Sequence, residues 1–537
     1  MKISLHARLP SEDTAQKLLF SGSEVFPGGS FRSDLAVTRR LAYLDGSPSR
    51  SKVQGLLTKE NAFAELTPQQ KVNLEAAGSD RALFLITGQQ PGLFGGAVLW
   101  FYKALTCAAL AREWSARLSL PVIPIFWAAG DDADLQECNH LELLEERASE
   151  VHGPLSLPFT KPAHPIPVST RHLDATAIAA LLARLTPLWN SETIETLRRA
   201  YSVPGTLTTG FLRLAQSQLG KEGILFVDGY SPNLRALARP VLELAIKKWA
   251  TYQAALLKGT EIAKAAGIQT QVPLRPGVVH AFSLLGGVRH RLYGETMVGG
   301  ADRIYTPEQP TTNLLSNLAG LDLTHDVFTR PLIADAVFPV LGHVLGPAEL
   351  RYFAQMSKLF PEITGDMPLL HPRMTAAVAS HQAWKDFQGE GLEISDLVRV
   401  GPAGLRTKLE DRIWKAHPAS SALSEMSGEK WIAGLRKMHS LYFPDQGPMQ
   451  RYEKTLGAAW KRYLRSLERM AFARSARTKE NLFKHLHWLG GGMGQDRHLN
   501  FPSLLYALGK EGLENFRTAV DPMQPEPQLF LFSKDEP

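Results

Sequence analysis

The chain has 537 residues, of which 44% are hydrophobic and 21% charged, a composition typical of a globular protein with a large core. Its 59 basic and 53 acidic residues leave a net charge of +6, which suits an anionic small-molecule ligand but does not indicate a nucleic-acid partner. Two cysteines, Cys107 and Cys138, are too few for a disulfide framework or a zinc pattern.

The N-terminal segment lacks the apolar core of a signal peptide, and no stretch approaches the roughly 20 apolar residues of a membrane span. We therefore expect a cytoplasmic protein with no membrane partner. Up to residue 80 the sequence predicts helices and loops, including a helix over 66–77.

Residues 82–129 predict a strand, a glycine loop, a helix and a second strand. Short apolar runs at 82–87 and 122–129 are typical of strands buried on both faces, and the pattern between 97 and about 118 has helical spacing. This order is the plan of a doubly wound parallel sheet, whose ligands bind beyond the carboxyl ends of the strands.

The loop after the first strand holds four glycines: Gly88, Gly92, Gly95 and Gly96. Glycines before a helix N-terminus let an anion approach backbone N–H groups, so these residues are candidates for cofactor binding. Gln89 and Gln90 add polar side chains at the same mouth and are candidates for substrate binding. An ordinary tight turn is the alternative, because the spacing matches neither a Walker loop nor GxGxxG.

An acidic cluster directly follows the second strand. Asp131, Asp132 and Asp134 lie within four residues, and Asn139 and His140 come soon after. Crowded carboxylates raise one another's pKa values, which suits a general base or a cation site. The alternatives are a solvated acidic turn or the N-cap of a helix expected over 135–146.

Further along, the sequence predicts helices at 176–185, 192–201, 211–219 and 231–256, a strand at 224–227, and a β-hairpin with a Gly-Gly turn within 271–305. Prolines limit any helix in 328–344 to short pieces, and 365–373 reads as a last strand. Arg330 and Arg373 are candidates for binding carboxylates, with a structural salt bridge as the alternative.

From about residue 385 the pattern becomes helical. A near-heptad set predicts a short antiparallel coiled coil or an arm packed on the body: Met449, Tyr452, Leu456, Ala459, Tyr463, Leu467 and Met470. A second subunit, in a homodimer, could cover its apolar face. A glycine run near residue 490 then leads to Gln495 and Arg497, which belong either to a phosphate-binding loop or to a flexible turn.

Several motifs resemble those of the BshC family, the cysteine-adding enzymes of bacillithiol biosynthesis. TGQQPGLFGG (87–96), FWAAGDDAD (126–134) and ECNH (137–140) are similar to the family patterns TGQQxGLFxGP and FWxAGEDHDxxExNH. Weaker matches follow in the same order as far as residues 372–373 and again near 497, so the resemblance covers nearly the full chain. This chain departs from the pattern at Ala133, where the family usually has histidine, and at Asp131, where it has glutamate.

The fold we expect is α/β: a Rossmann-like parallel sheet core with insertions over 1–384, an α-helical coiled-coil arm over 385–480, and a C-terminal segment over 481–537 that returns to the core. The resemblance implies a ligase that joins L-cysteine to glucosaminyl-malate in the last step of bacillithiol biosynthesis, giving a low-molecular-weight thiol. A free carboxylate does not react with an amine, so cysteine must be activated as an acyl-adenylate or acyl-phosphate, which implies ATP with Mg²⁺.

On this interpretation Asp132, Asp134 or His140 accepts the proton of the amine, with Asn139 beside them. Asp131, Gln89 and Gln90 bind substrate, Arg330 and Arg373 bind the malate carboxylates, and no resident metal site is predicted. Two other functions stay open: an adenylyl or nucleotidyl transferase acting on another acceptor, and a non-catalytic substrate-binding or scaffold protein.

Overall fold

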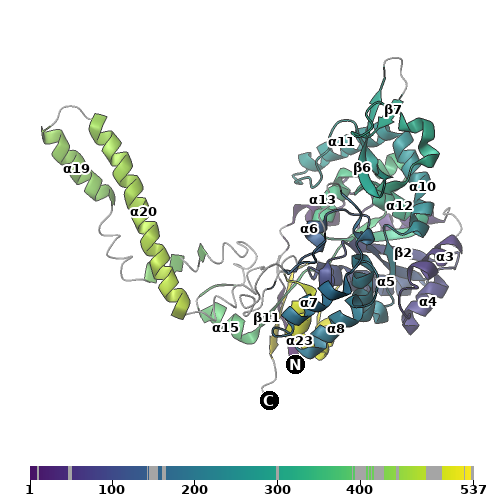
Figure 1. Ribbon diagram of the computed structural model, residues 1–537, viewed down its shortest axis with the longest axis horizontal. Helices are drawn as coiled ribbons and strands as arrows, with labels where there is room; N and C mark the ends of the chain where they lie inside the picture. The colour runs from purple at the N-terminus through teal and green to yellow at the C-terminus, as the bar shows by residue number, and fades with distance from the viewer. Residues whose placement is uncertain are drawn as a thin grey trace. The chain divides into compact units, whose positions relative to one another are not determined.

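Five parallel strands form the central sheet in the computed structural model. Figure 1 labels its middle strand, β2 (Leu83–Gln89). In spatial order they are β10 (Leu369–Pro372), β9 (Val340–Leu345), β2 (Leu83–Gln89), β3 (Val122–Ala128) and β4 (Leu225–Asp228). The chain builds β2, β3 and β4 outward in one direction and then returns to place β9 and β10 on the other side of β2. The predicted doubly wound sheet is therefore confirmed, with its switch point between β2 and β9.

The structure describes residues 1–8, 11, 13–45, 51–141, 143, 155–159, 165–297, 302–389, 391–393, 407–408, 411–412, 414–416, 428–442, 447–478, 499–524 and 526–533. These residues divide into two units. The first comprises 1–376 and 496–530 and contains the central sheet, and the second comprises 377–495 with 531–533.

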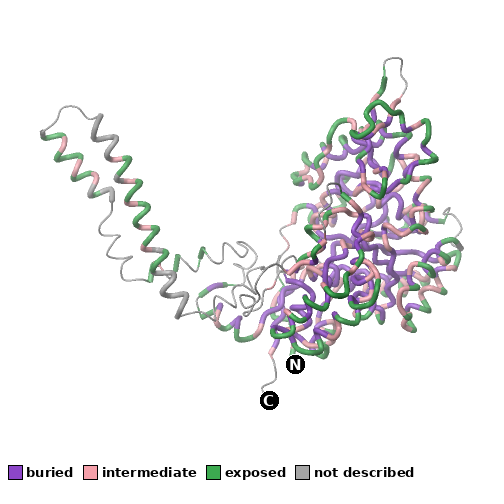
Figure 2. The backbone as a smooth tube through the Cα atoms, viewed as in Figure 1, coloured by how far each residue is buried: buried purple, intermediate pink, exposed green. Residues whose placement is uncertain are grey.

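Both faces of the central sheet are buried, because alternate residues of each strand point to opposite sides. Leu83 and Leu85 pack on one face against Trp114 of α5 (Leu99–Leu118). Phe84 and Ile86 pack on the other face in a core shared with α3 (Ser51–Glu60), α10 (Pro232–Lys247) and α12 (Thr329–Val337). Figure 2 shows this burial along the strands of the unit. The continuous apolar runs in the sequence follow from this double coverage.

A second sheet of four antiparallel strands shares that core. Its order is β7 (Asp302–Tyr305), β6 (Val288–Thr296), β5 (Val278–Leu285) and β8 (Leu323–His325). β5 and β6 form the predicted hairpin, and Gly286 and Gly287 make its turn with φ values of +58° and +81°. Two consecutive residues with positive φ define the type of turn that glycine favours, so the Gly-Gly prediction is confirmed.

The remaining helices of this unit are α1 (Thr14–Phe20), α2 (Asp34–Leu44), α4 (Pro68–Ala76), α6 (Leu135–Cys138), α7 (Ala175–Leu185), α8 (Ser191–Tyr201), α9 (Leu207–Leu219), α11 (Trp249–Ala265), α13 (Pro347–Gln355), α14 (Leu359–Ile363) and α23 (Phe501–Ala519). Short 3₁₀ turns are η1 (Leu93–Gly95), η3 (Val168–Thr170), η4 (Gly220–Glu222) and η5 (Leu314–Gly320).

Three predicted elements differ from the structure. The helix predicted over 231–256 is two helices, α10 and α11, because Lys248 leaves helical geometry with φ −109° and ψ 29°. The helix predicted over 135–146 is only the single turn α6 within the described residues. The first 80 residues are not only helices and loops, because they begin with strand β1 (Lys2–Arg8), a mostly exposed strand without the apolar run of a buried one.

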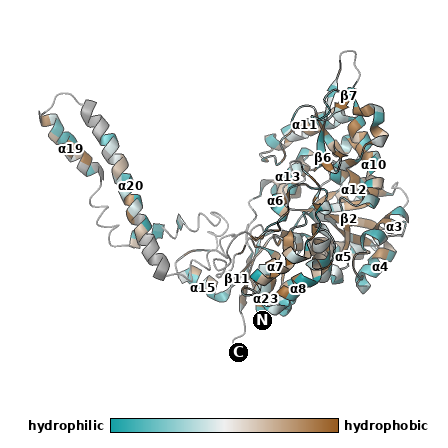
Figure 3. Cartoon of the chain, in the orientation of Figure 1, coloured by the Kyte–Doolittle hydropathy of each residue, from teal (hydrophilic) through white to brown (hydrophobic). Residues whose placement is uncertain are grey.

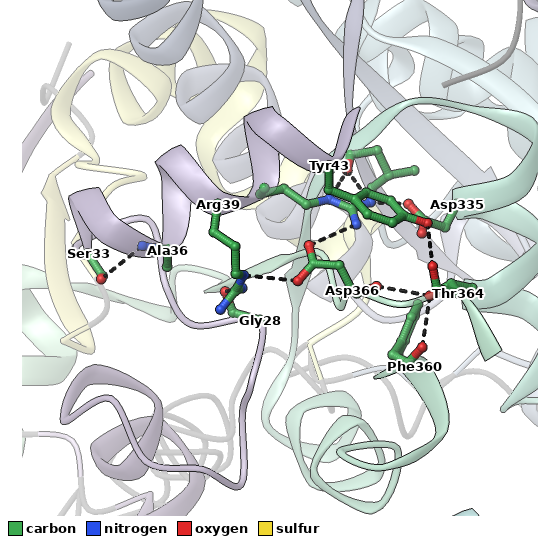
Figure 4. Close-up of polar contacts among 11 residues, drawn as sticks. Gly28, Ser33, Ala36, Arg39, Tyr43, Asp335, Phe360, Thr364 and Asp366 are labelled. Carbon is green, nitrogen blue, oxygen red and sulfur yellow. Dashed lines mark hydrogen bonds and ion pairs between the residues drawn. The ribbon is translucent and has the colours of Figure 1, made fainter. Parts of the chain in front are cut away.

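Arg40 of α2 links the N-terminal part of this unit to the central sheet. Figure 4 labels its neighbours Arg39 and Tyr43 on the same helix and its acidic partners Asp335 and Asp366. The fully buried guanidinium of Arg40 donates to the carbonyl of Val340 in β9 from Nε at 2.9 Å and from Nη2 at 2.8 Å. It also pairs with Asp335 of α12 and, at 3.2 Å, with Asp366. One side chain thus joins α2 to residues 335–340 and to Asp366, all of which lie about 300 residues further along the chain.

The second unit contains α15 (His381–Gly389), α19 (Gly428–Tyr442) and α20 (Gly447–Thr478), as well as most of β11 (Ala376–Ser380) and the last residues of β12 (Gln528–Ser533). α19 and α20 pack together, and Arg436 pairs with Glu453 at 2.7 Å between them. Figure 3 shows hydrophilic and hydrophobic residues intermixed along both helices. The helices are confirmed, and their heptad packing as a coiled coil stays a prediction.

Of the helices in the described parts of the chain, none is both long and apolar enough to cross a membrane.

Candidate functional site

A cavity of about 950 Å³ lies at the carboxyl edge of the central sheet, at the switch point. Most of the predicted site residues line it: Gly88, Gln89, Gln90, Gly92, Gly95, Gly96, Asp131, Asp132, His140, Arg330 and Arg373. They come from the ends of β2, β3 and β10 and from α12, so the parallel sheet brings together segments that the sequence separates. Strands of the antiparallel sheet supply a further wall.

The glycine loop takes its shape from contacts within the loop and from the hydroxyl of Tyr201 in α8. Gly95 and Gly96 have φ values of +95° and +60°, and a Cβ on Gly92 would lie 2.8 Å from the Cα of Gly96. The N–H of Gly95 donates to the Gly92 carbonyl at 3.0 Å and to the Tyr201 hydroxyl at 3.1 Å, and the N–H of Gly96 donates to Leu93 at 2.9 Å. These two N–H groups therefore stay within the protein and are not available to an anion in the cavity.

The segment before α23 closes this loop from outside. The N–H of Val98 donates to the carbonyl of Leu499, and the N–H of Phe501 donates to the carbonyl of Gly96, both at 2.9 Å. The rings of Trp100 and Phe501 lie 5.0 Å apart. The last part of the first unit is thus part of the site's frame.

Lys103 of α5 was not among the predicted site residues. Its buried ammonium donates to the carbonyl of Gly88 at 2.8 Å and to Oε1 of Gln89 at 2.9 Å, and it pairs with Glu349 at 2.6 Å. Burial lowers the pKa of Lys103 against the opposing effect of Glu349. Burial alone would raise the pKa of Glu349, but Lys103 and Arg330 lower it overall. Lys103 therefore links the end of β2, through these two hydrogen bonds, to α13, which follows β9, through the ion pair.

The two carboxylates nearest the end of β3 face basic groups of the antiparallel sheet. Asp131 is buried, with Oδ2 3.2 Å from Nδ1 of His325 and 3.7 Å from Nη2 of Arg289. Asp132 accepts a hydrogen bond from Gln90 at 2.5 Å and lies 3.8 Å from Nη1 of the same arginine. Arg289 therefore lies between both carboxylates and offsets their mutual repulsion.

Asp134 and Asn139 are placed differently from their neighbours in the predicted set, because neither lines the cavity. Asp134 accepts hydrogen bonds from the N–H groups of Gln136 and Glu137 as the N-cap of α6, which is the alternative that the sequence left open. The Asn139 amide donates to Leu157 at 3.4 Å. Glu137 does line the cavity, and burial, with the charge of Asp134, raises its pKa.

Arg330 already has protein partners in the cavity wall. Its guanidinium contacts the Tyr352 hydroxyl and lies 3.8 Å from Oε1 of Glu349. Arg275 and Arg291 line the cavity too, and both are exposed. Acidic ligands would therefore meet several guanidinium groups.

Arg373 has partners in the loop that follows β10. Its Nη1 donates to the carbonyl of Met374 at 2.8 Å and lies 3.3 Å from Oγ1 of Thr375.

A buried carboxyl group supports the loop that carries the acidic cluster. Ser169 of η3 donates from Oγ to Asp228 at 2.7 Å, and its N–H donates to Gly130 at 2.9 Å. The N–H of Val168 donates to the carbonyl of Asp132 at 2.8 Å. Burial raises the pKa of Asp228 to about 7. Asp228 ends β4 at the predicted edge, but it holds the loop in place rather than lining the cavity.

Two histidines on the cavity wall, His280 of β5 and His325 of β8, were also not predicted. The available signal was a histidine within β5, in the apolar run 278–282, and a histidine at the end of the short strand β8. Gln495 and Arg497 lie outside the described residues. Among the residues that are described, no three His, Cys, Asp or Glu side chains are placed to hold a metal ion. Cys107 and Cys138 are buried, which raises both thiol pKa values and makes thiolate chemistry unfavourable.

The fold and the site together define a Rossmann-like protein with a ligand-sized cavity, lined in part by charged side chains, at the switch point of its sheet. Residues 26–374, more than half of the chain, match the family model described as "Bacillithiol biosynthesis BshC, N-terminal Rossmann-like domain". The chain belongs to the BshC family.

Individual relatives extend the similarity along the chain. It is 27% identical over 435 residues to "Putative cysteine ligase BshC" of Solibacter usitatus (strain Ellin6076), covering 80% of each protein. It is also 27% identical over 503 residues to the protein of the same name from Heliobacterium modesticaldum (strain ATCC 51547 / Ice1), covering 87% of this chain and 88% of the relative. The family is therefore supported beyond the Rossmann-like domain.

Proposed function

We propose that this protein is a ligase that joins the carboxyl group of L-cysteine to the amine of glucosaminyl-malate, forming bacillithiol. Membership of the BshC family and the names of its relatives support this reaction. The observation that carries it is the cavity at the switch point, where Gln90 and Asp132 from the two most specific motifs meet Arg330 and Arg373.

The acidic acceptor is matched by the charge of the cavity wall. Malate contributes two carboxylates, and guanidinium groups bind carboxylates through paired hydrogen bonds. Arg330 and Arg373 are the proposed partners, and Arg275 and Arg291 line the same space. Asp131, Gln89 and Gln90 are proposed to orient the amino-sugar and the cysteine through hydrogen bonds.

Activation of the cysteine carboxyl requires a phosphate-bearing co-substrate, for which we propose ATP with Mg²⁺. When bound, ATP would supply the leaving group on the cysteine carbonyl. The N–H groups of Gly95 and Gly96 donate within the protein, so this part of the proposal depends on the arginines and on Lys103 rather than on those two amides. Gln495 and Arg497 remain proposed contributors.

The test is to incubate the purified protein with L-cysteine, glucosaminyl-malate, ATP and Mg²⁺, and to follow bacillithiol, AMP and ADP by mass. Product with AMP indicates an adenylate, and product with ADP indicates an acyl-phosphate. Saturable binding of glucosaminyl-malate without product would favour a non-catalytic binding protein. Transfer of AMP to a different acceptor with release of pyrophosphate, without bacillithiol, would favour an adenylyl transferase. The absence of both binding and product would contradict the proposal.

Two variants test the cavity directly. Asp132→Asn and Arg330→Ala should each reduce bacillithiol formation at least tenfold, because both side chains line the cavity. The matched controls are Asp322→Asn and Arg235→Ala, which remove either partner of a 2.9 Å ion pair outside the cavity. Equal activity in the cavity variants and the controls would show that Asp132 and Arg330 take no part in the reaction.

A further inference from the structure

We propose that His280, held by Asp326, is the general base that takes the proton from the attacking amine. The inference rests on the proposed ligase function and deepens it. The two residues come from β5 and from the turn between β8 and α12, in the wall of the cavity that faces the glycine loop and the acidic cluster. Both lie outside the acidic cluster at residues 131–134.

The strand places His280 toward the cavity. Val279 and Ala281 are buried in the core beneath the antiparallel sheet, so the residue between them faces the other way, and it lines the cavity with Phe282. The pairing of β5 with β6 shifts between Val279 and Phe282, which leaves His280 in a β-bulge. Bulges re-aim side chains and are frequent beside active sites.

The carboxylate of Asp326 fixes the orientation of the ring. Its Oδ2 lies 2.7 Å from Nδ1 of His280, while its Oδ1 accepts hydrogen bonds from the N–H groups of Phe328 and Thr329, both at 2.9 Å. Burial alone would raise the pKa of Asp326, but His280 and these N–H groups hold it at about 2. The aspartate is therefore ionised and can only accept a hydrogen bond at Nδ1.

A neutral imidazole that donates from Nδ1 must accept at Nε2. Nε2 of His280 is buried and has no protein partner among the described residues. A buried acceptor without a partner is costly, which is unusual unless a ligand or water fills that position. The histidine and aspartate thus have the relation of base and orienting carboxylate found in catalytic triads.

Two other histidines of this sheet also lie beside carboxylates, but one differs from His280 in the partners of its carboxylate and the other in its position. His325 shares Asp131 with Arg289, and burial lowers its pKa against the charge of that aspartate. His290 lies 2.8 Å from Glu308, but it does not line the cavity. Only His280 among these three combines a cavity position with a carboxylate that makes no ion pair with an arginine.

Ligation removes two protons from the attacking nitrogen. The ammonium of glucosaminyl-malate gives one proton to Nε2 of His280, and the free amine attacks the carbonyl carbon of the activated cysteine, an acyl-phosphate or acyl-adenylate. A C–N bond forms, the C–O bond to the phosphate breaks, and the phosphate leaves with the electron pair of that bond. The second amine proton goes to solvent, and the imidazolium returns to neutral imidazole by losing its proton.

The test compares ligation with a reaction that needs no base. Hydroxylamine is neutral at pH 7 and traps an activated cysteine carboxyl as the hydroxamate. In His280→Ala we expect bacillithiol formation to fall by a factor of about 10²–10⁴. Hydroxamate formation should stay near the wild-type rate, and added imidazole should restore part of the ligation.

Asp326→Asn and His290→Gln complete the design. Asparagine can still accept from Phe328 and Thr329, but its amide donates to Nδ1 and moves the ring proton to Nε2, so ligation should fall as it does in His280→Ala. His290→Gln removes the histidine of an equivalent pair outside the cavity and should keep wild-type ligation. The affinity for glucosaminyl-malate, measured by calorimetry, should change less than threefold in all three proteins.

Each unfavourable result would contradict a different part of the proposal. Wild-type ligation in both His280→Ala and Asp326→Asn would overturn the role of His280 and leave the ligase function intact. Loss of hydroxamate together with ligation, without imidazole rescue, would show a structural role and overturn the base. A wild-type protein that forms neither bacillithiol nor hydroxamate would overturn the ligase function and this proposal with it.

Discussion

Lys103 is a charged side chain on the buried side of α5, surrounded along the helix by Tyr102, Ala104 and Cys107. Burying an ammonium group is costly unless its partners replace water, and here two oxygens of the β2 end and the carboxylate of Glu349 do so. The helix interior would accommodate an apolar residue more easily. The lysine is therefore explained by the site rather than by the packing of the helix.

Lys103→Met should lower the free energy of unfolding by about 3 kcal/mol, because it leaves the buried Glu349 without its closest cation. Adding Glu349→Gln should recover part of that loss. The double variant should therefore lose less free energy of unfolding than the sum of the losses in the two single variants. Urea unfolding of the four proteins measures this coupling. Arg112→Met, which breaks an exposed pair with Glu222, is the control and should cost less than about 1 kcal/mol. Additive losses would contradict the coupling.

Asp228 should make stability depend on pH. Its pKa is raised from 3.8 in the reference state to about 7 in the folded protein. Between these values the folded protein binds a proton that the unfolded chain has lost, so stability falls as pH rises through this window. Asp228→Asn, which mimics the protonated acid, should therefore gain roughly 2–3 kcal/mol relative to wild type between pH 5 and pH 8.

Thermal unfolding at pH 5 and pH 8 checks this expectation. The control is Asp174→Asn at the N-cap of α7, where the exposed side chain accepts from Thr176 and Ala177. The difference in stability between Asp174→Asn and wild type should be the same at both pH values. If the difference in stability between Asp228→Asn and wild type were also the same at pH 5 and pH 8, Asp228 would already be ionised at pH 5.

At the scale of elements, the sequence predicted those that have a strong local pattern. β2, β3, β4, α5 and the β5–β6 hairpin were found because buried apolar runs, helical spacing and a Gly-Gly turn are properties of short segments. The break between α10 and α11 was missed because Lys248 is an ordinary helix-forming residue, and the helices part through their different packing rather than through a proline or glycine. β1 was missed because most of its residues are exposed.

Tyr201 of α8 is the expected anchor of the glycine loop. Its hydroxyl accepts from the N–H of Gly95 and donates to the carbonyl of Gly92, both at 3.1 Å. Tyr201→Phe should cost about 1–3 kcal/mol, because it removes a buried hydrogen-bonding group. It should also speed amide hydrogen exchange in residues 92–97. The control is Tyr252→Phe, which removes a buried hydroxyl without a partner in the described structure, and which should leave exchange in the loop unchanged. Unchanged exchange in both variants would mean that the loop holds its shape without Tyr201.

At the scale of the whole molecule, the site could be predicted only in part. Consecutive motifs identified Gln90, Asp131 and Asp132, and the rule for doubly wound sheets placed them at one edge. Glu349, Lys103 and His280 could not be found in this way, because their role depends on which strands become neighbours. β9 pairs with β2 although the strands that follow β2 in the chain lie on its other side, and no local pattern encodes that choice.

The long-range contacts of Arg40 should contribute to the stability of the whole first unit. Arg40→Met should lower the free energy of unfolding by about 3–5 kcal/mol, because it leaves Asp335 and Asp366 buried without their shared cation. Burial, opposed by Arg40, already raises the pKa of Asp335 to about 6. Without the arginine this pKa should rise further, so the variant should lose more stability than wild type as pH rises from 5 to 8.

Thermal unfolding across that pH range provides the measurement. Arg39→Met removes a more exposed partner of Asp366, at 3.0 Å, and should produce a smaller loss with little dependence on pH. Equal losses of unfolding free energy in the two variants would show that burial of the Arg40 guanidinium contributes nothing to stability.

The closure of the glycine loop by Leu499, Asn500 and Phe501 has a consequence for how the protein is made. Ribosomes deliver the chain from its N-terminus, so η1 and α5 emerge long before the segment that pairs with Ala97 and lines the cavity. During most of translation the nascent site lacks this wall, and a ligand cannot assist folding by binding to a completed cavity. Stabilisation of the complete cavity by a ligand can therefore begin only after synthesis has passed residue 501.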